Sequence, residues 1–253
     1  MYLIHSEIVE KIVLPNSVYI LKIYSPTVAS KIIPGQFLNI RVSEYSYPLL
    51  RRPFSICDVE DDFIFILYKT FGEGTKLMAE KSVGDKLDIL GPLGQGFNFE
   101  GNYDTAIIAA GGLGSAPFPF LTRQLRGKKE IHSFVGGRTE NDVIIYGMEN
   151  VSTASDDGSV GFKGNVVELL ASKIDCLNSE KIKIFGCGPK PMLKSLQEFA
   201  IKNDFNCEIS TECAMACGFG ICQGCPIDSV NDPDKYLMVC KDGPVFDVKD
   251  III

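Results

Sequence analysis

The sequence has 253 residues, of which 45% are hydrophobic and 23% are charged, and its formal net charge is −7. This length predicts two domains with room for a small appended segment, and the negative charge argues against nucleic acid, whose phosphates would repel it. Residues 1–13 carry Glu7 and Glu10 and lack the basic and apolar regions of a secretory signal. The strongest apolar run, FIFILY, is as long as a strand and too short to span a membrane, so we expect a cytoplasmic protein.

Residues 1–101 show the pattern of an all-β domain. Their apolar residues come in short alternating or β-branched runs, which are SVYILKIYS, GQFLNIRVS, RPFSICDV, DFIFILYKT and DKLDILG. Turn signals such as LPNS, IPGQ, VEDD and SVGD separate these runs at intervals typical of an antiparallel barrel or sandwich. One helix is expected in this part of the chain, around GTKLMAEK.

From about Asn102 onward, the pattern changes to alternating strands and helices. The strand-like runs are TAIIAAGG, EIHSFVGG, NVSTAS, KIKIFGCG and CEISTE, and the helix-like runs are SAPFPFLTRQLRG, GNVVELLASKI and KPMLKSLQEFAIKN. Repeated β-α units of this kind predict a doubly wound parallel sheet. The remaining segment, from Cys213 to the end, has no helical period, and its glycine and cysteine content predicts a small, loop-rich cap.

The cysteines of this last segment indicate a metal centre. A reducing cytosol prevents lasting disulfides, so nine cysteines require another chemical reason. Cys217, Cys222 and Cys225 follow the C-x4-C-x2-C spacing of a plant-type [2Fe-2S] cluster, with Cys240 as a distant fourth ligand. The alternatives are a structural zinc site and thiols without a ligand, although zinc ribbons use two C-x2-C pairs and only one occurs here. Cys213 could replace Cys217, but only Cys217 completes the spacing.

The stretch LLRRPFSI contains residue types suited to a flavin. An arginine can bind a cofactor phosphate in bidentate fashion, an aromatic side chain can cover a flat ring, and a hydroxyl can reach a ring nitrogen. Arg52, Phe54 and Ser55 supply these groups. An exposed arginine beside a core phenylalanine is the simpler explanation when this stretch is taken alone.

The stretch TFGEGTKLM is a candidate for binding a pyrophosphate. Gly72, Gly74 and Thr75 precede the expected helix, and the free backbone N–H groups at a helix N-terminus attract anions. An ordinary glycine turn with Thr75 as the N-cap residue is the alternative.

Two further turns are candidates for binding a dinucleotide. Gly112 and Gly114 in IIAAGGLGSAP, and Cys187 and Gly188 in IFGCGPKPM, follow predicted buried strands whose carboxyl ends would face a ligand crevice. The first stretch lacks the G-x-G-x-x-G fingerprint, and tight β-α turns explain both stretches equally well.

The motifs together carry more information than any one of them. RRPFSI, FGEGT, GPLGQGF, GGLGSAP, DDGSVGFKG, CGPKPM, CGFGICQGC and CKDGPVF occur in this order over residues 51–246. This order resembles the ferredoxin-reductase superfamily and, within it, the electron-transfer subunits of NAD-dependent dihydroorotate dehydrogenases. The resemblance implies an FAD-binding β-barrel over residues 1–101, an NAD-binding α/β domain over 102–212 and a [2Fe-2S] domain over 213–253.

The resemblance also implies roles for individual residues near FAD. Arg52 would bind its phosphate, Phe54 would lie by the isoalloxazine and Ser55 would approach the reactive ring nitrogen, while Gly72 and Thr75 would hold the pyrophosphate. The remaining residues that it places at the cofactor are Pro53, Leu67, Tyr68 and Lys69. No catalytic acid or base of the chain is required, because hydride passes between flavin and nicotinamide directly.

The function implied is electron transfer from the FMN of a partner dihydroorotate dehydrogenase catalytic subunit, through [2Fe-2S] and FAD, to NAD⁺ in pyrimidine (UMP) biosynthesis. The resemblance further implies a heterotetramer with two copies of each subunit. The alternatives are a related flavin and iron–sulfur subunit of a ferredoxin:NAD(P) oxidoreductase, sulfide dehydrogenase or hydrogenase, and a non-redox, zinc-containing nucleotide-binding module. Arg138 lies where a 2′-phosphate of NADP could bind, but the resemblance favours NAD.

Overall fold

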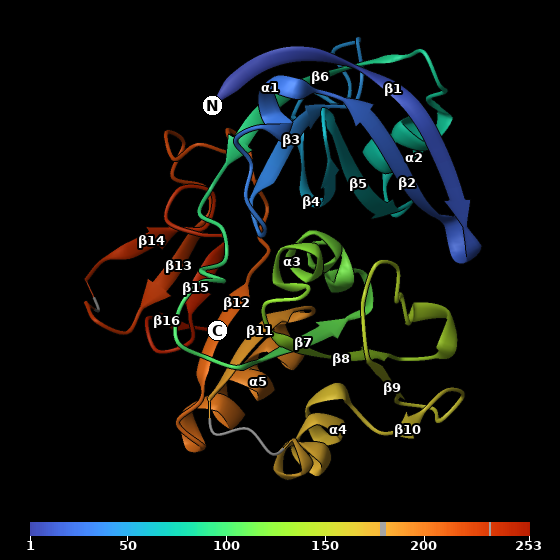
Figure 1. The fold of residues 1–253 in the computed structure, drawn as a ribbon. Coiled ribbons are helices and arrows are strands. Elements are labelled where there is room, and N and C mark those ends of the chain that lie inside the picture. Colours follow the sequence, from blue (N-terminus) through green and yellow to red (C-terminus); the bar gives the residue numbers. More distant parts are fainter. Residues whose placement is uncertain (178–180, 233) are drawn as a thin grey trace.

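The computed structural model describes residues 1–177, 181–232 and 234–253, and it consists of a barrel above an open sheet with a third layer at their side (Figure 1). The barrel is closed in the order β1-β2-β5-β4-β3-β6, and all of its pairings are antiparallel. Its strands are β1 (Tyr2–Leu14), β2 (Val18–Tyr24), β3 (Phe37–Arg41), β4 (Arg52–Glu60), β5 (Phe63–Lys69) and β6 (Lys86–Leu93). The predicted barrel is therefore confirmed.

Two helices accompany the barrel. The expected helix is α2 (Glu73–Glu80), and a short helix that the sequence pattern did not indicate is α1 (Pro26–Ala29). Strand alternation explains the barrel core, because Leu38 and Ile40 of β3 are fully buried among the inward-facing residues. The alternate residues of β3 point out of the barrel, and two of them, Phe37 and Asn39, pack toward the cysteine segment described below.

The central sheet has the order β10-β9-β8-β7-β11-β12-β15. The strands from β10 to β12 run parallel, which confirms the doubly wound prediction, whereas β15 is antiparallel to β12. The strands are β7 (Thr105–Gly111), β8 (Glu130–Gly137), β9 (Val151–Ser155), β10 (Phe162–Lys163), β11 (Ile182–Cys187), β12 (Asn206–Ser210) and β15 (Val245–Asp247). The chain order reverses between β7 and β11, and ligands bind at such a switch point in open α/β sheets.

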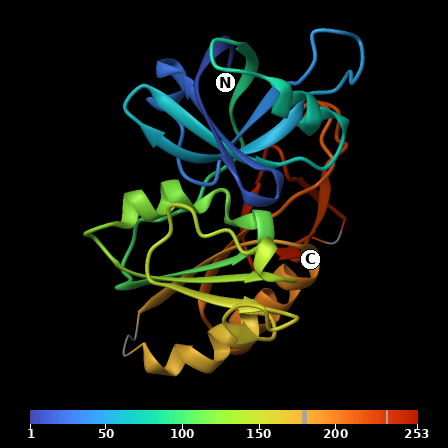
Figure 2. The same ribbon diagram turned by 90° about the vertical axis from the view of Figure 1, so that its right-hand side faces the viewer.

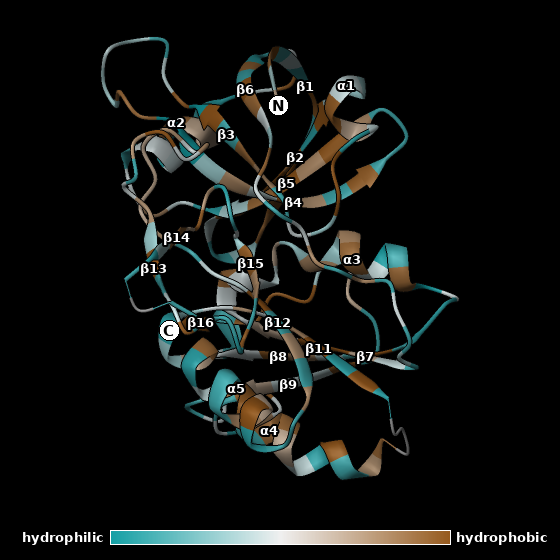
Figure 3. Cartoon of the chain, turned by 90° about the vertical axis from the view of Figure 1, so that its left-hand side faces the viewer, coloured by the Kyte–Doolittle hydropathy of each residue, from teal (hydrophilic) through white to brown (hydrophobic). Residues whose placement is uncertain are grey.

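Helices cover both faces of this sheet, because its central strands are apolar on both sides (Figure 3). The helices are α3 (Phe118–Leu125), α4 (Val166–Lys173) and α5 (Lys190–Lys202). Ile108 of β7 packs with residues of α3, which lies between the sheet and the barrel, while Ile107 packs with residues of α4 and α5 on the opposite face.

The cysteine segment lies beside both the barrel and the central sheet, as the red part of the ribbon shows in Figures 1 and 2. It is less loop-rich than expected, since it forms a three-stranded sheet in the order β14-β13-β16. These strands are β13 (Pro226–Ser229), β14 (Tyr236–Met238) and β16 (Ile251–Ile252). Within the described residues, no helix is both long and apolar enough to cross a membrane.

Candidate functional site

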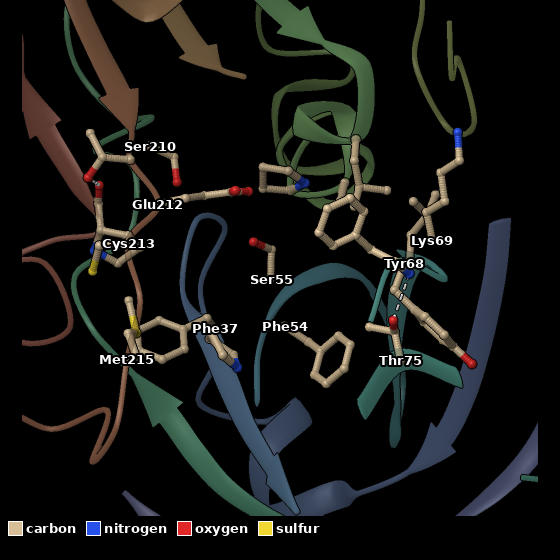
Figure 4. A pocket seen from close by; sticks show the side chains of 18 residues that line it. Phe37, Phe54, Ser55, Tyr68, Lys69, Thr75, Ser210, Glu212, Cys213 and Met215 are labelled. Carbon is tan, nitrogen blue, oxygen red and sulfur yellow. Dashed lines mark hydrogen bonds between the residues drawn. The ribbon is translucent and has the colours of Figure 1, made fainter. Parts of the chain in front are cut away.

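A cavity of about 370 Å³ lies where the barrel, the central sheet and the cysteine segment meet (Figure 4). Its volume is within the range of small-molecule sites. The barrel and α2 contribute Phe37, Pro53, Phe54, Ser55, Leu67, Tyr68, Lys69, Phe71 and Thr75. The central sheet and the cysteine segment contribute Leu113, Ala116, Pro117, Ser210, Thr211, Glu212, Cys213, Met215 and Pro244. Seven predicted flavin residues thus share one cavity, and they are Pro53, Phe54, Ser55, Leu67, Tyr68, Lys69 and Thr75.

The side chains on the barrel wall differ in their orientation. Ser55 points toward the middle of the cavity, whereas Phe54 lies deeper, is 6% exposed, and packs edge to face against Tyr68 at 5.7 Å between ring centroids. The ammonium group of Lys69 extends away from the centre and pairs with Asp142 at 3.4 Å. The wall therefore presents apolar and aromatic surface with one central hydroxyl, which fits a flat heteroaromatic ring.

Arg52, Gly72 and Gly74 lie outside this cavity, at the start of α2. A Cβ atom on Gly74 would come within 3.2 Å of Arg52 Nε, so the absence of a side chain at residue 74 lets the guanidinium lie over the helix start. The alternative prediction of Thr75 as the N-cap residue is wrong, because Gly72 is the N-cap. Thr75 Oγ1 instead accepts hydrogen bonds from the N–H groups of Phe71 (2.8 Å) and Gly72 (3.2 Å). A cation beside glycine backbone at a helix start fits a phosphate.

The two predicted dinucleotide turns meet at the switch point between β7 and β11. A Cβ atom on Gly114 would lie 2.4 Å from the Cys187 carbonyl oxygen and 2.6 Å from Gly188 Cα, so the turns touch through their backbones. Gly112 has φ +56°, which favours glycine. Cys187 is 2% exposed, and burial raises the pKa of its thiol well above the ordinary range.

A buried hydroxyl next to these turns is the observation that fits a bound ligand. Ser115 is 1% exposed, and its Oγ has no hydrogen-bond partner within residues 1–177, 181–232 and 234–253. A buried hydroxyl without a partner costs free energy. The backbone edge formed by Gly112, Gly114 and Gly188, with this hydroxyl beside it, suits a nucleotide phosphate or ribose.

The cysteine loop brings its four predicted ligands together as two pairs. Cys225 and Cys240 have their sulfur atoms 3.1 Å apart, and the Cys222 N–H lies 3.5 Å from Cys217 Sγ. In the described part of the chain, no three Cys, His, Asp or Glu side chains converge around one point, so the thiols do not form a closed cage. The pairs match the need of a two-iron cluster, in which the four thiolates are divided between two metal ions.

Backbone N–H groups are directed at the sulfur atoms of this loop. The Gly220 N–H donates to Cys240 Sγ at 3.1 Å, and Gly218 and Gly220 have φ +83° and +88°, which let the backbone curl around the thiols. Burial acts to raise the pKa of the Cys217 thiol, but hydrogen bonds from the Cys222, Phe219 and Ile221 N–H groups outweigh burial and lower the pKa to about 6. The thiolate needed for metal binding is thereby favoured.

Four residues at this junction were not indicated by the sequence patterns. Phe37 lines the cavity and also packs in one core with Cys225 and Cys240. The Glu212 carboxylate extends into the cavity opposite Ser55, and although solvent reaches it through the opening, enclosure by the cavity walls raises its pKa. The other two are Met215, which also lines the cavity, and Asn39, which is described below. Their residue types and positions are ordinary, so no local motif could have identified them.

Cys213 lies between the cavity and the thiol pairs. It lines the cavity, and burial together with the neighbouring Cys225 thiol raises its pKa to about 12. The pKa of the Cys240 thiol is raised to about 12 as well, so protonation does not separate Cys213 from the predicted ligands. Cys213 is left out of the ligand set because only Cys217 completes the C-x4-C-x2-C spacing.

The comparisons with known proteins agree with this architecture. Residues 212–252 match the family model described as the iron-sulfur cluster binding domain of dihydroorotate dehydrogenase B. A solved structure of an NADH-dependent reduced ferredoxin-NADP oxidoreductase matches with a TM-score of 0.86 and 25% identity, covering 98% of this chain and 89% of that one. Phthalate dioxygenase reductase shares the fold, with a TM-score of 0.65 and 17% identity over 89% of this chain and 72% of that one. The fold is that of a ferredoxin-type flavin reductase with an iron–sulfur binding segment.

Full-length relatives identify the family more closely. The dihydroorotate dehydrogenase B (NAD(+)) electron transfer subunit of Caldanaerobacter subterraneus subsp. tengcongensis is 38% identical over 226 residues, covering 87% of each chain. The subunit of the same name from Fusobacterium nucleatum subsp. nucleatum is 36% identical over 258 residues, covering 96% of each chain. The chain belongs to the family of electron transfer subunits of NAD(+)-dependent dihydroorotate dehydrogenase B. The function implied by the sequence resemblance, that of an electron-transfer subunit of NAD-dependent dihydroorotate dehydrogenase, is thus confirmed at the level of the family.

Proposed function

We propose that this chain carries electrons between NAD(H) and the FMN of a dihydroorotate dehydrogenase catalytic subunit in pyrimidine biosynthesis, using FAD in the cavity and a [2Fe-2S] cluster on the cysteine loop. One observation carries this proposal: Cys213 lines the cavity and also lies beside the Cys225 thiol. The proposed flavin site and the proposed cluster site are therefore neighbours, as electron transfer between them needs.

On the barrel side, the chain would bind and orient FAD. The Ser55 hydroxyl is placed to meet the edge of the isoalloxazine, and Pro53 and Phe54 supply apolar surface for its ring system. Arg52, together with Gly72, Gly74 and Thr75 at the start of α2, would hold the pyrophosphate.

On the central sheet, the chain would bind the nicotinamide nucleotide at the switch point. The touching turns that contain Gly112, Gly114, Cys187 and Gly188 would supply backbone N–H groups, and Ser115 would supply its buried hydroxyl. Cys187 would contribute through its backbone, because its thiol is buried and held protonated.

On the cysteine loop, Cys217 and Cys222 would bind one iron, and Cys225 and Cys240 would bind the other. When bound, FAD supplies the exchange between hydride and single electrons, and the cluster supplies a one-electron relay. The residues of the chain would hold these groups next to one another, with FAD in the cavity and the cluster on the cysteine loop beside it. We also propose that residues 1–101, 102–212 and 213–253 act as FAD, NAD and cluster units, in a heterotetramer with two copies of the catalytic partner.

A comparison of Cys222→Ser with Cys176→Ser tests this function. Cys176 is exposed and lies outside the cysteine loop, so its variant controls for the loss of a surface thiol. In anaerobic complexes with the catalytic subunit, we expect Cys222→Ser to keep FAD and its reduction by NADH, but to lose at least about tenfold in dihydroorotate-dependent NAD⁺ reduction. A colourless wild-type protein that contains zinc, or a yellow-brown complex that oxidises dihydroorotate without reducing NAD⁺, would overturn the proposal.

A further inference from the structure

Asn39 is a fully buried amide on the outer side of the flavin barrel. It lies on β3 between Leu38 and Ile40, whose side chains enter the barrel core, so its own side chain points the opposite way. The Asn39 Nδ2 atom donates a hydrogen bond of 3.2 Å to the Cys217 carbonyl oxygen, across 178 residues of sequence. The barrel thus holds the backbone of the first predicted cluster ligand.

The cysteine loop is shaped to accept this amide. Gly218 follows Cys217, and a Cβ atom at that residue would lie 2.6 Å from Asn39 Nδ2. The positive φ of Gly218 adds a second reason for glycine. A side chain at residue 218 would therefore displace either the Asn39 amide or the loop.

The backbone of Asn39 is held by residues of the neighbouring part of the barrel. Pro53, its partner on β4, has no N–H to donate, and Arg51 Nη1 reaches the Asn39 carbonyl oxygen at 3.4 Å. Arg51 is itself fixed by Asp88, because its Nη2 donates to both carboxylate oxygens of Asp88 at 2.9 Å. Pro53 also lines the cavity, so the strand pair β3–β4 touches the flavin cavity and the cysteine loop together.

The chemistry of Asn39 argues for more than packing. Its Oδ1 atom is buried and has no hydrogen-bond partner among the residues that the structure describes. A half-satisfied amide is more costly to bury than an aliphatic side chain of similar size. The one hydrogen bond that the Asn39 side chain makes is to the backbone of Cys217 in the cysteine loop. The position of this backbone affects the proposed electron transfer, so we take the hydrogen bond as the reason for an amide at residue 39.

We infer that Asn39 is a positioning residue, which fixes the cysteine loop against the flavin barrel and so sets the placement of the cluster relative to the cavity. This inference rests on the proposed function, since it takes Cys217 as a cluster ligand. Asn39 acts through the backbone of Cys217 and does not itself bind either cofactor. Partners of this kind that orient metal ligands commonly change metal affinity or activity by 10–100-fold when they are lost.

The test compares Asn39→Leu with Gln197→Leu in the complete holoprotein. Gln197 is a matched control, because its side-chain amide also donates to main-chain carbonyls of the C-terminal segment, at Val248 and Ile251, but away from the cysteine loop. We expect Asn39→Leu to release iron to a chelator about tenfold faster than wild type and to shift the cluster midpoint potential measured by EPR titration. Reduction of FAD by NADH should stay at the wild-type rate in both variants.

Gly218→Ala tests the same contact from the loop, in case Asn39→Leu does not fold. Its control is Gly84→Ala, which has a similar φ of +93° but no atom within 4 Å of the added methyl group. We expect Gly218→Ala to repeat the faster iron release and the shifted potential, and Gly84→Ala to show neither.

Three outcomes would overturn the inference, and they are distinguishable. If wild type contains a cluster but Asn39→Leu and Gly218→Ala match it in iron release and potential, the positioning role is wrong while the proposed function stands. If Gln197→Leu and Gly84→Ala produce the same changes, the effect is general loosening of the chain. If wild type contains no iron–sulfur cluster, the proposed function fails and the inference fails with it.

Discussion

Arg123 of α3 and Asp58 of β4 join the central sheet to the barrel, with Nε–Oδ1 and Nη2–Oδ2 distances of 2.8 and 2.5 Å. Asp58 is 7% exposed, and its hydrogen bond to the guanidinium raises the pKa of Arg123. Arg123 itself is 38% exposed. We expect Arg123→Met to lower the free energy of unfolding by about 1–2 kcal/mol, because a largely buried carboxylate loses its partner.

Urea unfolding measures this effect, with Arg126→Met as the control. Arg126 lies just beyond the same helix and pairs with Glu149, but both side chains are more exposed, so its loss should cost less than about 1 kcal/mol. Equal effects of the two substitutions would show that the Arg123–Asp58 pair has no special part in joining the domains.

Arg52→Met should weaken FAD binding. If the Arg52 guanidinium binds a cofactor phosphate beside Gly74, its loss removes a charge-assisted hydrogen bond, and we expect the Kd for FAD to rise about tenfold or more. Flavin fluorescence during titration of the flavin-free chain measures this. Arg41→Met is the control, because Arg41 also lies on the barrel but donates to the carbonyls of Ser43 and Glu44. A Kd that does not change in Arg52→Met contradicts the role given to Arg52.

Cys213→Ser should keep the cluster. The Cys213 thiol lies outside the two pairs formed by Cys217 with Cys222 and Cys225 with Cys240. Iron and acid-labile sulfide analysis should give about two irons per chain, as in wild type, whereas Cys217→Ser should lose iron. If Cys213→Ser loses iron and Cys217→Ser keeps it, Cys213 is the ligand and Cys217 is not.

Glu212 should make the stability of the flavin-free chain depend on pH. Enclosure raises the pKa of its carboxyl in the folded state, so the folded state binds the proton more tightly than the unfolded state. Its stabilising contribution is complete below the ordinary pKa of glutamate and is lost as the pH rises through the raised value. Glu212→Gln should abolish this loss.

To test this, the urea concentration at the midpoint of unfolding is measured for Glu212→Gln and for wild type between about pH 4 and about pH 8. Glu198→Gln, on the exposed side of α5, serves as the control and should follow the wild-type curve. If the midpoints of Glu212→Gln and wild type vary with pH in parallel, Glu212 does not titrate differently in the folded state.

Local patterns were enough to predict the two main layers. Alternation over DKLDILG and continuous apolar character over TAIIAAGG correspond to β6 and β7, because each pattern reports which faces of a strand are covered. The C-x4-C-x2-C spacing was similarly informative, since a loop that supplies several ligands must keep them close in sequence.

Local sequence patterns could not predict contacts between segments that are far apart in the sequence. Asn39 is an unremarkable residue in the run FLNIR, and only the folded chain shows that it meets Cys217. Glu212 follows an ordinary strand, and its place in the cavity depends on how the cysteine segment leaves β12. The β15 strand has three residues, too few for any periodicity, and its pairing is decided by the open edge of β12.

That pairing has a consequence for dissecting the molecule. Ile209 of β12 lies opposite Phe246 of β15, so the segment that carries the predicted cluster ligands also covers the outer edge of the central sheet. Cutting the chain after residue 212 would strip that cover and leave β12 as a bare edge, open to pairing with other molecules. The cysteine segment therefore cannot be removed without exposing a strand edge, and a truncated protein of residues 1–212 would present for self-association an edge that β15 covers in the full chain.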